Sequence, residues 1–556
     1  MPVINAENFA ELYKLEFLII YIAICFLNGV LLLFSSNKFL LAFQQCHYKE
    51  KEYLKWFSSK QNSYIPRLFL LCLMAFLFFC VLCTTFAPVL GEIASSYIGF
   101  VSYVLFVAIY INTERHVNAK MVLKKTRRMV RLCITYFILI MILTFGVITL
   151  SNALAFWFKS RAFALVMYAL TCITPLIAPV VLTIASLINK PFEVWNNKRY
   201  VNSCKDMLAK SNVIKIGITG SYGKTTVKNI LSTMLGCKYR VLATPESYNT
   251  PLGVSLAVKK LDATHDIFIA EMGARRKGDI EDLASIVKPD YAVLTGVNAQ
   301  HLETFGTKEV VLATKFELFE NLGSNGKGFF SSDNDGAKTL YDKFDGEKYS
   351  AGIDGELVKA ENITITENGI SFVLKIQGEN PVECNTTLLG KHNISNICLS
   401  AGVAYKIGLT PAEIADGINR LKAVNHRLEL VANQRGIKII DDSYNANEDG
   451  VKAAIDVLKA FNGRKIVVTP GLIELGKREN LANYEMGKLL ATACDKVIII
   501  GKHNAEMLIK GLFDGGKSNE DIIFAKNLEK GNEKLNEIIK EGDVVLFEND
   551  LPDTYN

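Results

Sequence analysis

The stretch G-I-T-G-S-Y-G-K-T-T-V-K-N-I, residues 217–230, decides the fold of the second half of this chain. A short apolar run leads into it, and a pattern typical of an amphipathic helix follows it. Gly217, Gly220 and Gly223 allow backbone N–H groups to turn toward a phosphate, and the helix that follows presents its positive end there. The stretch therefore predicts a phosphate-binding loop between a strand and a helix.

The residues after the last glycine fit the same chemistry. We expect Lys224 to reach the β and γ phosphates of a nucleotide and Thr225 to place its hydroxyl on Mg²⁺. The strict G-x-x-x-x-G-K-[ST] pattern is not met, because position 218 is Ile218. A purely structural glycine turn is the alternative, but G-K-T-T directly between an apolar strand and a helix favours nucleotide binding.

The chain as a whole is too long for one domain and too apolar for a purely soluble protein. It has 556 residues, of which 50% are hydrophobic, and a net charge of +6. Its mean hydropathy is +0.21. The second half has no basic stripe with interleaved aromatics, so we expect no nucleic-acid partner. The twelve cysteines are scattered, as is typical of small buried side chains in a reducing compartment.

Residues 1–190 predict an α-helical transmembrane domain of about five spans. Lys and Arg gather in the loops 35–67 and 113–131, so the positive-inside rule places the N-terminus outside and everything after about residue 190 in the cytoplasm. These loops could also hold anionic lipid headgroups. No acid or base stands mid-span, so we interpret the spans as an anchor in the cytoplasmic membrane, or as a platform for a lipid-bound substrate. The predicted spans lie near Glu16–Phe34, Leu68–Leu90, Ile93–Ile111, Leu132–Leu150 and Phe163–Ile188.

A polar, basic linker at 191–212 separates this region from an α/β half, and we expect it to lie along the membrane surface. Short β-branched runs alternate with amphipathic segments over 213–424, which is typical of a mostly parallel sheet covered by helices. Alternating residues within 345–390 predict an antiparallel insert. A second α/β set at 425–556 predicts a Rossmann-like C-terminal domain.

The phosphate-loop stretch and five later motifs together resemble the Mur ligases, which join amino acids to a cell-wall precursor. The similarity is to the branch that adds D-alanyl-D-alanine to UDP-N-acetylmuramoyl-tripeptide, and it covers about residues 213–556. The first two hundred residues have no counterpart in that branch. The later motifs are T-P-E-S-Y-N-T-P-L-G-V (244–254), E-M-G-A-R-R-K-G-D-I (271–280), H-L-E-T-F-G (301–306), H-N-I-S-N (392–396) and D-D-S-Y-N-A-N (441–447).

The resemblance implies ATP-dependent amide formation. A carboxylate takes the γ-phosphoryl group to become an acyl phosphate, and an incoming amine displaces the phosphate. Charge gathers on the phosphoryl oxygens, so the site needs cations and N–H dipoles more than it needs a nucleophile. The residues implied to hold the ATP phosphates are Gly220, Ser221, Gly223, Lys224 and Thr226.

The resemblance also implies two Mg²⁺ sites. Thr225 and Glu271 would hold one ion, as suits hydroxyl and carboxylate ligands. His301 matches the second metal ligand. Lys315 lies at the offset from His301 at which the family carries a lysine modified by CO₂ to a carbamate, an anion that can help to bind the second Mg²⁺. Without that register, Lys315 would be interpreted as a surface lysine on a helix. With Lys224, the residues His301 and Lys315 form the implied catalytic group.

The remaining implied contacts surround the nucleotide. Asn393 and Asn396 fit the family's H-N-x-x-N near the adenine. Arg427 and Asp442 resemble residues that the C-terminal domain brings to ATP as it closes and excludes water. For Asn447 an Asx turn or a helix cap is the alternative. Two further residues implied to line this cleft are Tyr444 and Asn445.

The chain departs from the family where the substrates would bind. The family's first domain holds the uridine-diphosphate end of the acceptor, and the predicted spans stand in its place. G-L-I-E-L-G (471–476) replaces a common G-D-M-x-E-L-G, F-E-N-D-L-P-D (547–553) replaces a K-G-S-R, and Glu448 replaces a proline. We therefore expect a membrane-held acceptor, such as a lipid-linked glycan or a growing polymer, whose surface concentration substitutes for the lost domain.

Four alternatives stay open at this point. The chain could be a D-alanyl-D-alanine-adding wall enzyme with an added anchor, or a membrane-bound poly-amino-acid synthetase. A P-loop module that drives transport is disfavoured by the clean spans and by the absence of an L-S-G-G-Q stretch. A membrane nucleotide sensor would be expected to lose Glu271, His301 or Lys315, and all three are present.

Overall fold

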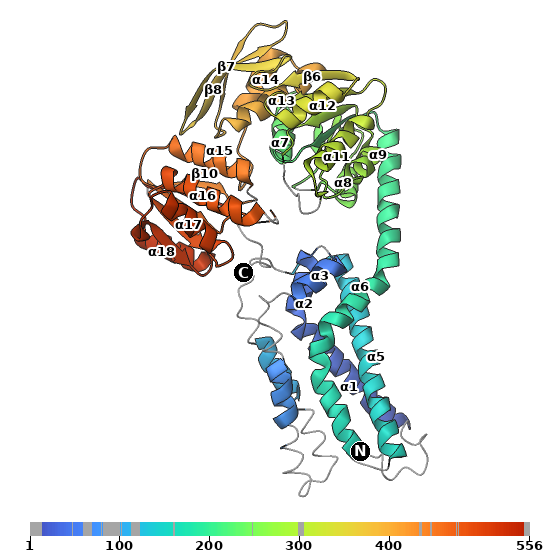
Figure 1. Cartoon of the computed structure of the whole chain (residues 1–556). Helices are drawn as coiled ribbons and strands as arrows, with labels where there is room; N and C mark the ends of the chain where they lie inside the picture. The colour runs from blue at the N-terminus through green and yellow to red at the C-terminus, as the bar shows by residue number, and fades with distance from the viewer. Residues whose placement is uncertain are drawn as a thin grey trace. The chain divides into compact units, whose positions relative to one another are not determined.

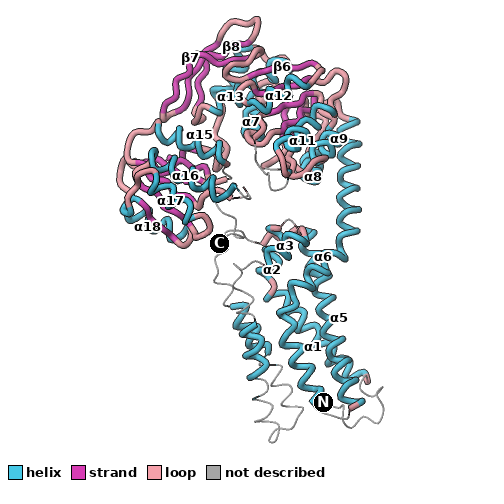
Figure 2. The backbone as a smooth tube through the Cα atoms, viewed as in Figure 1, coloured by secondary structure: helices cyan, strands magenta, loops and turns pink. Residues whose placement is uncertain are grey.

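The computed structural model divides the chain into two compact units, one up to Asn196 and the other from Asn197 to Leu551, and each is described by itself (Figure 1). Among the residues that the structure describes, the first unit is helical and every strand lies in the second (Figure 2). The structure describes residues 14–46, 48–58, 69–78, 81, 101, 103–112, 123–158, 162–246, 248–298, 305–432, 436–444, 447–473, 475 and 478–549.

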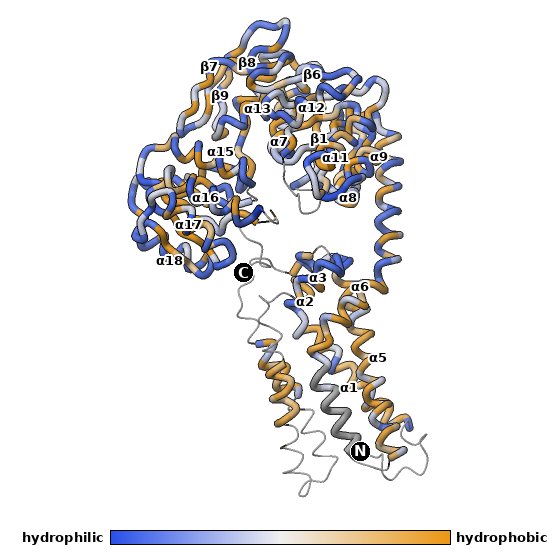
Figure 3. Tube along the Cα trace, viewed as in Figure 1, coloured by the Kyte–Doolittle hydropathy of each residue, from blue (hydrophilic) through white to orange (hydrophobic). Residues whose placement is uncertain are grey.

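Three helical stretches in this described part of the chain are long and apolar enough to cross a membrane: Phe17–Ser35, Arg127–Trp157 and Thr174–Lys210. Apolar residues follow α5 in Figure 3. About half of the second and third predicted spans lies outside the described residues, and the helices described within them are short and apolar, at Phe69–Phe78 and Tyr103–Asn112. The labelled helices are α1 (Leu15–Ser35), α2 (Asn37–Gln45), α3 (Glu50–Phe57), α5 (Arg127–Trp157) and α6 (Ala162–Lys210).

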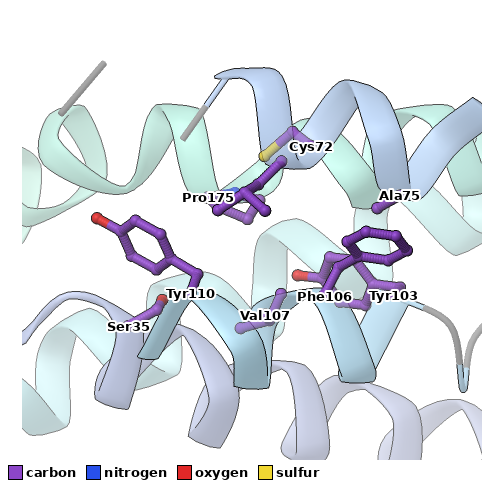
Figure 4. A pocket seen from close by; sticks show the side chains of 9 residues that line it. Ser35, Cys72, Ala75, Tyr103, Phe106, Val107, Tyr110 and Pro175 are labelled. Carbon is purple, nitrogen blue, oxygen red and sulfur yellow. The ribbon is translucent and has the colours of Figure 1, made fainter. Parts of the chain in front are cut away.

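Neutral polar side chains tie these apolar helices together. The Asn28 amide donates to Thr144 Oγ1 at 2.9 Å, and the Tyr103 hydroxyl donates to Asn28 Oδ1 at 2.8 Å, with all three side chains buried. An apolar cavity of about 20 Å³ lies nearby, with Pro175 and Val107 in its wall (Figure 4). That volume is close to the space of one water molecule, so the cavity has no room for a substrate.

Helix α6 continues through the residues predicted to form a linker. It runs to Lys210 and contains Pro191 within its length. In its last turns Cys204 and Leu208 are buried and belong to an apolar core with Phe268 of the second unit. The predicted linker is therefore helical, and its end is packed into the α/β unit.

The second unit begins with a nine-stranded sheet in the order β2-β3-β1-β4-β5-β6-β7-β8-β9. Neighbours from β2 to β7 are parallel, and β7, β8 and β9 are antiparallel, so the predicted parallel sheet and antiparallel insert are both confirmed. The strands are β1 (Ile214–Thr219), β2 (Val241–Ala243), β3 (Ile267–Glu271), β4 (Tyr291–Leu294), β5 (Lys327–Ser331), β6 (Glu347–Ala351), β7 (Val358–Thr366), β8 (Gly369–Ile376) and β9 (Val382–Thr386).

Helices cover both faces of this sheet because alternate strand residues are buried on each side. Ile216 and Ile218 of β1 share a core with α7, α13 and α14, whereas Phe268 and Ala270 of β3 share one with α8, α9, α11 and α12. The helices are α7 (Lys224–Leu235), α8 (Pro251–Val258), α9 (Asp279–Val287), α11 (Lys308–Glu320), α12 (Asp335–Lys343), α13 (His392–Ile407) and α14 (Pro411–Asn419).

A second sheet of six strands follows, in the order β10-β11-β15-β12-β13-β14. All its neighbours are parallel except β10 and β11. The sheet lies within the second α/β set predicted at 425–556, with β10 and β14 at its edges. The elements are β10 (Glu429–Ala432), β11 (Lys438–Asp442), β12 (Lys465–Thr469), β13 (Lys496–Ile500), β14 (Ile522–Ala525), β15 (Val544–Glu548), α15 (Glu448–Lys459), α16 (Glu479–Ala493), α17 (Ala505–Asp514), η4 (Asn519–Asp521) and α18 (Leu528–Ile538).

The junction between the two sheets holds an unusual backbone. His426 has φ of 62° and Leu428 has φ of 46°, so two non-glycine residues in the left-handed region flank Arg427. Each such residue costs ~1–2 kcal/mol relative to an ordinary conformation. The surrounding contacts therefore hold this turn against its local preference.

Candidate active site

The glycine-rich loop connects β1 to α7 as predicted, and two of its glycines are required by close contacts. A Cβ on Gly220 would lie 2.0 Å from Thr295 Oγ1, and a Cβ on Gly223 would lie 3.0 Å from Asn396 Oδ1. Gly223 also caps α7 with φ of 75°, a conformation that side-chain-bearing residues rarely adopt. The loop thus passes close to β4 and α13, and its backbone amides turn at the positive end of α7.

Lys224 is the first residue of α7 and folds back over the loop. Its ammonium donates to the carbonyl oxygens of Gly220 at 2.7 Å and Ser221 at 3.2 Å. Burial lowers the pKa of Lys224 to about 8, with Arg427 lowering it further and Glu271 acting in the opposite direction. A cation with so few acceptors in a buried loop is suited to meet a phosphate anion.

Glu271 ends β3 and gathers three donors although it is only 2% exposed. The Thr225 hydroxyl and the Lys228 ammonium each lie 3.0 Å from Oε2, and the Asn249 amide donates to Oε1 at 3.2 Å. The structure therefore brings together the two residues predicted to hold Mg²⁺, Thr225 and Glu271. A hydroxyl and a carboxylate are oxygen ligands of the kind that Mg²⁺ prefers.

Sequence reasoning missed Lys228 and Asn249 in this site. The ammonium of Lys228, which is 2% exposed, also donates to the carbonyl oxygen of Glu246. Its position four residues after Lys224 places both on one face of α7, and this spacing was the available signal. Asn249 lay within the T-P-E-S-Y-N-T-P motif that carried the resemblance.

Lys315 lies on α11 and is only 3% exposed, which rules out the surface-lysine alternative. Burial lowers its pKa to about 7, and the charge of Lys224 contributes to the shift. Two residues further along α11, Glu317 accepts hydrogen bonds from the backbone N–H of Gly278 at 2.8 Å and of Glu281 at 3.1 Å, which fixes the helix against the start of α9. His301 lies outside the described residues.

A cavity of about 520 Å³ adjoins the loop within the second unit. Asn393 and Asn396 form part of its wall and are tied together, because the Asn396 amide donates to Asn393 Oδ1 at 3.4 Å. His392 also lines it. The predicted site residues in the cavity wall are Gly223, Thr226, Asn393, Asn396, Arg427, Asp442 and Asn447.

The C-terminal sheet contributes charged groups to the same cavity. Arg427 lies with its guanidinium 4.5 Å from the ring centre of Tyr444, which orients the cation. Asp442 accepts a hydrogen bond from the Leu428 backbone N–H at 3.2 Å. Burial raises the pKa of Asp442 to about 6, although that N–H and Arg427 both lower it. Asn445 lies outside the described residues.

Asn447 has the capping geometry that was considered as an alternative. Its side-chain oxygen accepts from the backbone N–H of Asp449 at 3.0 Å and of Gly450 at 2.9 Å, and so caps α15. It lines the cavity from this capping position.

Comparisons with known proteins agree with this architecture. The family profile described as Mur ligase middle domain matches residues 218–404, and the profile described as Mur ligase, glutamate ligase domain matches residues 426–548. A UDP-N-acetylmuramoyl-tripeptide–D-alanyl-D-alanine ligase of Bacillus subtilis is 30% identical over 340 residues, which are 60% of this chain and 72% of that protein. This chain belongs to the Mur ligase family. It is accordingly an ATP-dependent ligase.

Solved structures of Mur ligases share the fold of the second unit. The MurF ligase of Thermotoga maritima, in complex with ADP, is 27% identical with a TM-score of 0.57, and the match covers 64% of this chain and 80% of that one. MurF from Acinetobacter baumannii gives a TM-score of 0.59 at 22% identity, covering 65% of this chain and 78% of that one, and shows the fold alone. The family profiles begin at residue 218, so the N-terminal helices precede the matched part.

Proposed function

We propose that this chain is a membrane-anchored ligase that activates a carboxylate of a cell-envelope acceptor as an acyl phosphate and joins it to an amino acid or dipeptide. The observation that carries the proposal is the meeting of Lys224, Thr225 and Glu271 at the end of a strand, beside a cavity whose wall comes from both sheets. The proposed domains are a transmembrane domain at 1–190, a linker at 191–212, a central ATP-binding domain at 213–424 and a C-terminal ligase domain at 425–556.

Phosphoryl transfer needs positive charge around the γ-phosphoryl oxygens. Lys224 and the loop amides supply part of that charge. Thr225 and Glu271 have the oxygen ligands to hold Mg²⁺, which when bound neutralises charge on the phosphates. The Lys228 ammonium holds Glu271 in place, because both side chains are buried and Nζ lies 3.0 Å from Oε2.

We also propose a carbamate at Lys315. A lysine whose pKa is about 7 has a substantial neutral fraction at physiological pH, and only the neutral amine reacts with CO₂. The nitrogen of the neutral amine forms a bond to the carbon of CO₂ and loses one proton, which gives the carbamate anion. Starting from the ammonium, two protons are released in all. That anion, with His301, would hold a second Mg²⁺. A carbamate signal from the protein in ¹³C-bicarbonate that is absent in Lys315→Arg would test this step.

The cavity provides the place for the rest of the nucleotide. We assign its Asn393 and Asn396 wall to the adenine, and Arg427, Asp442, Tyr444 and Asn445 to the contacts made from the C-terminal domain. The wall of this cavity comes from both domains, so the cavity is enclosed only when both domains are in place. The enclosed cavity excludes water, which would otherwise hydrolyse an acyl phosphate.

The acceptor is proposed to be membrane-held, such as a lipid-linked glycan or polymer. The support is that three apolar helices stand before the matched part of the chain. The named B. subtilis relative joins D-alanyl-D-alanine to UDP-N-acetylmuramoyl-tripeptide. A D-alanyl-D-alanine ligase of the same kind with an added anchor is the second candidate, supported by that similarity. A poly-amino-acid synthetase stays the third. In each case we place the protein in the cytoplasmic membrane with its α/β unit in the cytoplasm.

Phosphate release by the detergent-purified chain tests the proposal. Amino acids, D-alanyl-D-alanine, UDP-N-acetylmuramoyl-tripeptide and a lipid-linked glycan are added in turn, and Lys224→Ala is compared with the exposed control Lys238→Ala. We expect release that needs Lys224, an amine and a lipid-linked acceptor together. Release with the soluble nucleotide tripeptide alone would favour the second candidate. ATP binding that no pair of substrates turns into phosphate release would instead indicate a nucleotide sensor.

A further inference from the structure

Tyr222 places a large aromatic side chain in the middle of the phosphate loop, where it lines the cavity of the candidate active site. Its ring lies against Gly296, since a Cβ on that glycine would come within 2.7 Å of Tyr222 Cζ and Oη. The tyrosine hydroxyl accepts a hydrogen bond from the Asn334 amide at 3.0 Å. Asn334 is itself fixed, because its Oδ1 accepts the backbone N–H groups of Val297 and Ala337, both at 2.9 Å. The ring is therefore packed against the loop after β4 and bonded to the loop after β5.

The segment after β4, residues 295–298, is bonded to the phosphate loop along its length. The Ser221 backbone N–H donates to the Gly296 carbonyl at 2.8 Å, and the Asn298 backbone N–H donates to Ser221 Oγ at 3.2 Å. The Thr295 hydroxyl donates to the Tyr222 carbonyl. These bonds, together with the packing of the Tyr222 ring, set the position of the 295–298 segment relative to the phosphate loop.

The far end of the 295–298 segment reaches the C-terminal sheet. The Asn298 amide donates to Asp449 Oδ2 at 2.9 Å, and a hydrogen bond to a carboxylate is stronger than one between neutral groups. Asp449 lies in the first turn of α15, where its backbone N–H is capped by Asn447, and it lines the same cavity as Tyr222. Burial raises the pKa of Tyr222, and the negative charge of Asp449 adds to the shift, so this acid lies near the ring as well.

This arrangement connects nucleotide binding to the contact with α15. Gly223 and Lys224 follow Tyr222 directly in the chain, so phosphates that lie on the loop are close to the residues that hold the 295–298 segment. The same segment carries the bond to Asp449. Two contacts made to one fixed segment are energetically coupled, because each changes the free energy of the other. The bond to α15 is therefore expected to slow the release of a nucleotide.

We propose that Tyr222 and Asp449 are positioning residues that act as a pair to retain the nucleotide. Tyr222 sets the 295–298 segment against the phosphate loop, and Asp449 binds Asn298 of that segment from the C-terminal sheet. Both residues act through the segment between them rather than on the reacting atoms. The inference concerns ATP itself, so it holds whichever acceptor and amine are joined.

The release of a fluorescent ATP analogue, N-methylanthraniloyl-ATP, from the full chain in detergent with Mg²⁺ tests this assignment. The complex is mixed with excess ATP, and the fluorescence decay gives the dissociation rate. Asp449→Ala and Tyr222→Ser should each raise this rate about tenfold, and should change the association rate by less than about twofold. Glu529→Ala should match the wild type. It is a matched control, because Glu529 follows the N-cap Asn527 of α18 by two residues, as Asp449 follows Asn447.

The double variant distinguishes positioning from a merely structural role. If Tyr222 acts through the segment that Asp449 binds, Tyr222→Ser combined with Asp449→Ala should release the analogue about tenfold faster than the wild type, no more than either single variant. Two independent contacts would instead multiply to about a hundredfold. A hundredfold increase, or a single variant that releases the analogue at the wild-type rate, would overturn the proposal.

A second variant keeps the test valid if Tyr222→Ser melts early. Tyr222→Phe then takes its place in the double variant, since it keeps the ring on Gly296 and loses only the bond to Asn334. Its release rate should rise about threefold, again without adding to the effect of Asp449→Ala. Binding of the analogue to the wild type is measured first, and its absence would overturn this proposal and the ligase function together, whereas independent effects would overturn the pairing alone.

Discussion

Two buried glutamates occupy matching places in the two sheets of this protein and have opposite surroundings. Glu271 ends β3 at the carboxyl edge of the first sheet, and Glu548 ends β15 at the carboxyl edge of the second. Thr225, Lys228 and Asn249 all donate to Glu271. Glu548 receives no hydrogen bond at all.

The difference teaches what each acid is prepared for. A buried carboxyl group that three donors surround is held in one position, and its oxygens are of the kind that a metal ion needs. A buried carboxyl group with no donor and an acidic neighbour has a raised pKa, because its charged form has no compensating partner. The same residue type at the same place in a sheet thus has two chemistries, and the neighbours decide between them.

The largest expected effect on activity comes from replacing Glu271, the first glutamate. Glu271→Gln should lower kcat for ATP turnover by about 10²–10³-fold, the range for removing one electrostatic contact to a developing charge. The amide keeps the shape but loses the charge that Mg²⁺ requires. Steady-state kinetics over a range of Mg²⁺ concentrations would show it, with the exposed control Glu320→Gln unaffected. Activity near that of the wild type would show that Glu271 holds no metal ion.

Removing the cation beside Glu271 should destabilise the fold. Lys228→Met leaves a buried carboxylate without its ammonium, and we expect the free energy of unfolding to fall by about 3–5 kcal/mol. Urea denaturation followed by far-ultraviolet circular dichroism would measure this change in the free energy of unfolding. Lys238→Met, an exposed lysine on the turn after the same helix, should change stability by less than about 0.5 kcal/mol. Equal effects of the two substitutions would contradict the importance of the buried pair.

Replacing Glu548, the second glutamate, should instead raise the free energy of unfolding at high pH. The folded-state pKa of Glu548 is raised, so the native state binds more protons than the unfolded state above the ordinary carboxyl pKa, and stability is lost as the pH rises through that window. Glu548→Gln cannot ionise, so it should flatten this pH dependence and raise the free energy of unfolding at pH 8 by about 1–3 kcal/mol. Denaturation at pH 5 and pH 8 gives the comparison. A variant that is less stable than the wild type at pH 8 would mean that the acid is satisfied in solution.

The smallest effect concerns the helix cap in the cavity wall. Asn447→Ala should cost about 1 kcal/mol of stability, as a lost N-cap does, and should also weaken nucleotide binding. Asn527 caps α18 with an equivalent bond to the Lys530 N–H at 3.0 Å and does not line the cavity. Asn527→Ala should therefore lower the melting temperature similarly while leaving the nucleotide affinity unchanged. Equal nucleotide affinities in both variants would restrict Asn447 to its capping role.

The parts of this site that the sequence predicts are those set by local spacing. The loop from Gly220 to Thr225 follows from the glycine pattern between an apolar run and a helix. Its meeting with Glu271 also follows, because sequential βα units place the carboxyl ends of neighbouring strands together, and Ile218 of β1 pairs with Glu271.

The remaining features depend on contacts between distant residues. Lys228 finds its acid 43 positions away in the sequence, and its spacing of four residues from Lys224 was its one local signal. Glu548 was visible only as part of a departure from the family pattern, since its burial is created by strands on both sides. The short edge strands β10 and β14 have weak local patterns. The polar, basic composition of 191–212 suggested a linker, but α6 continues through Pro191 to the packed Leu208.

The turn that holds Arg427 has a consequence for how this protein can evolve. His426 and Leu428, on either side of it, both occupy a backbone region in which glycine, asparagine and aspartate are the comfortable residues. Glycine at 428 would relax the backbone but would remove a side chain that belongs to the core of the C-terminal sheet. Glycine would suit the left-handed backbone but not the core, and a bulkier branched residue would not meet both requirements either. Few substitutions at this junction can therefore be tolerated, and Leu428 also lines the cavity.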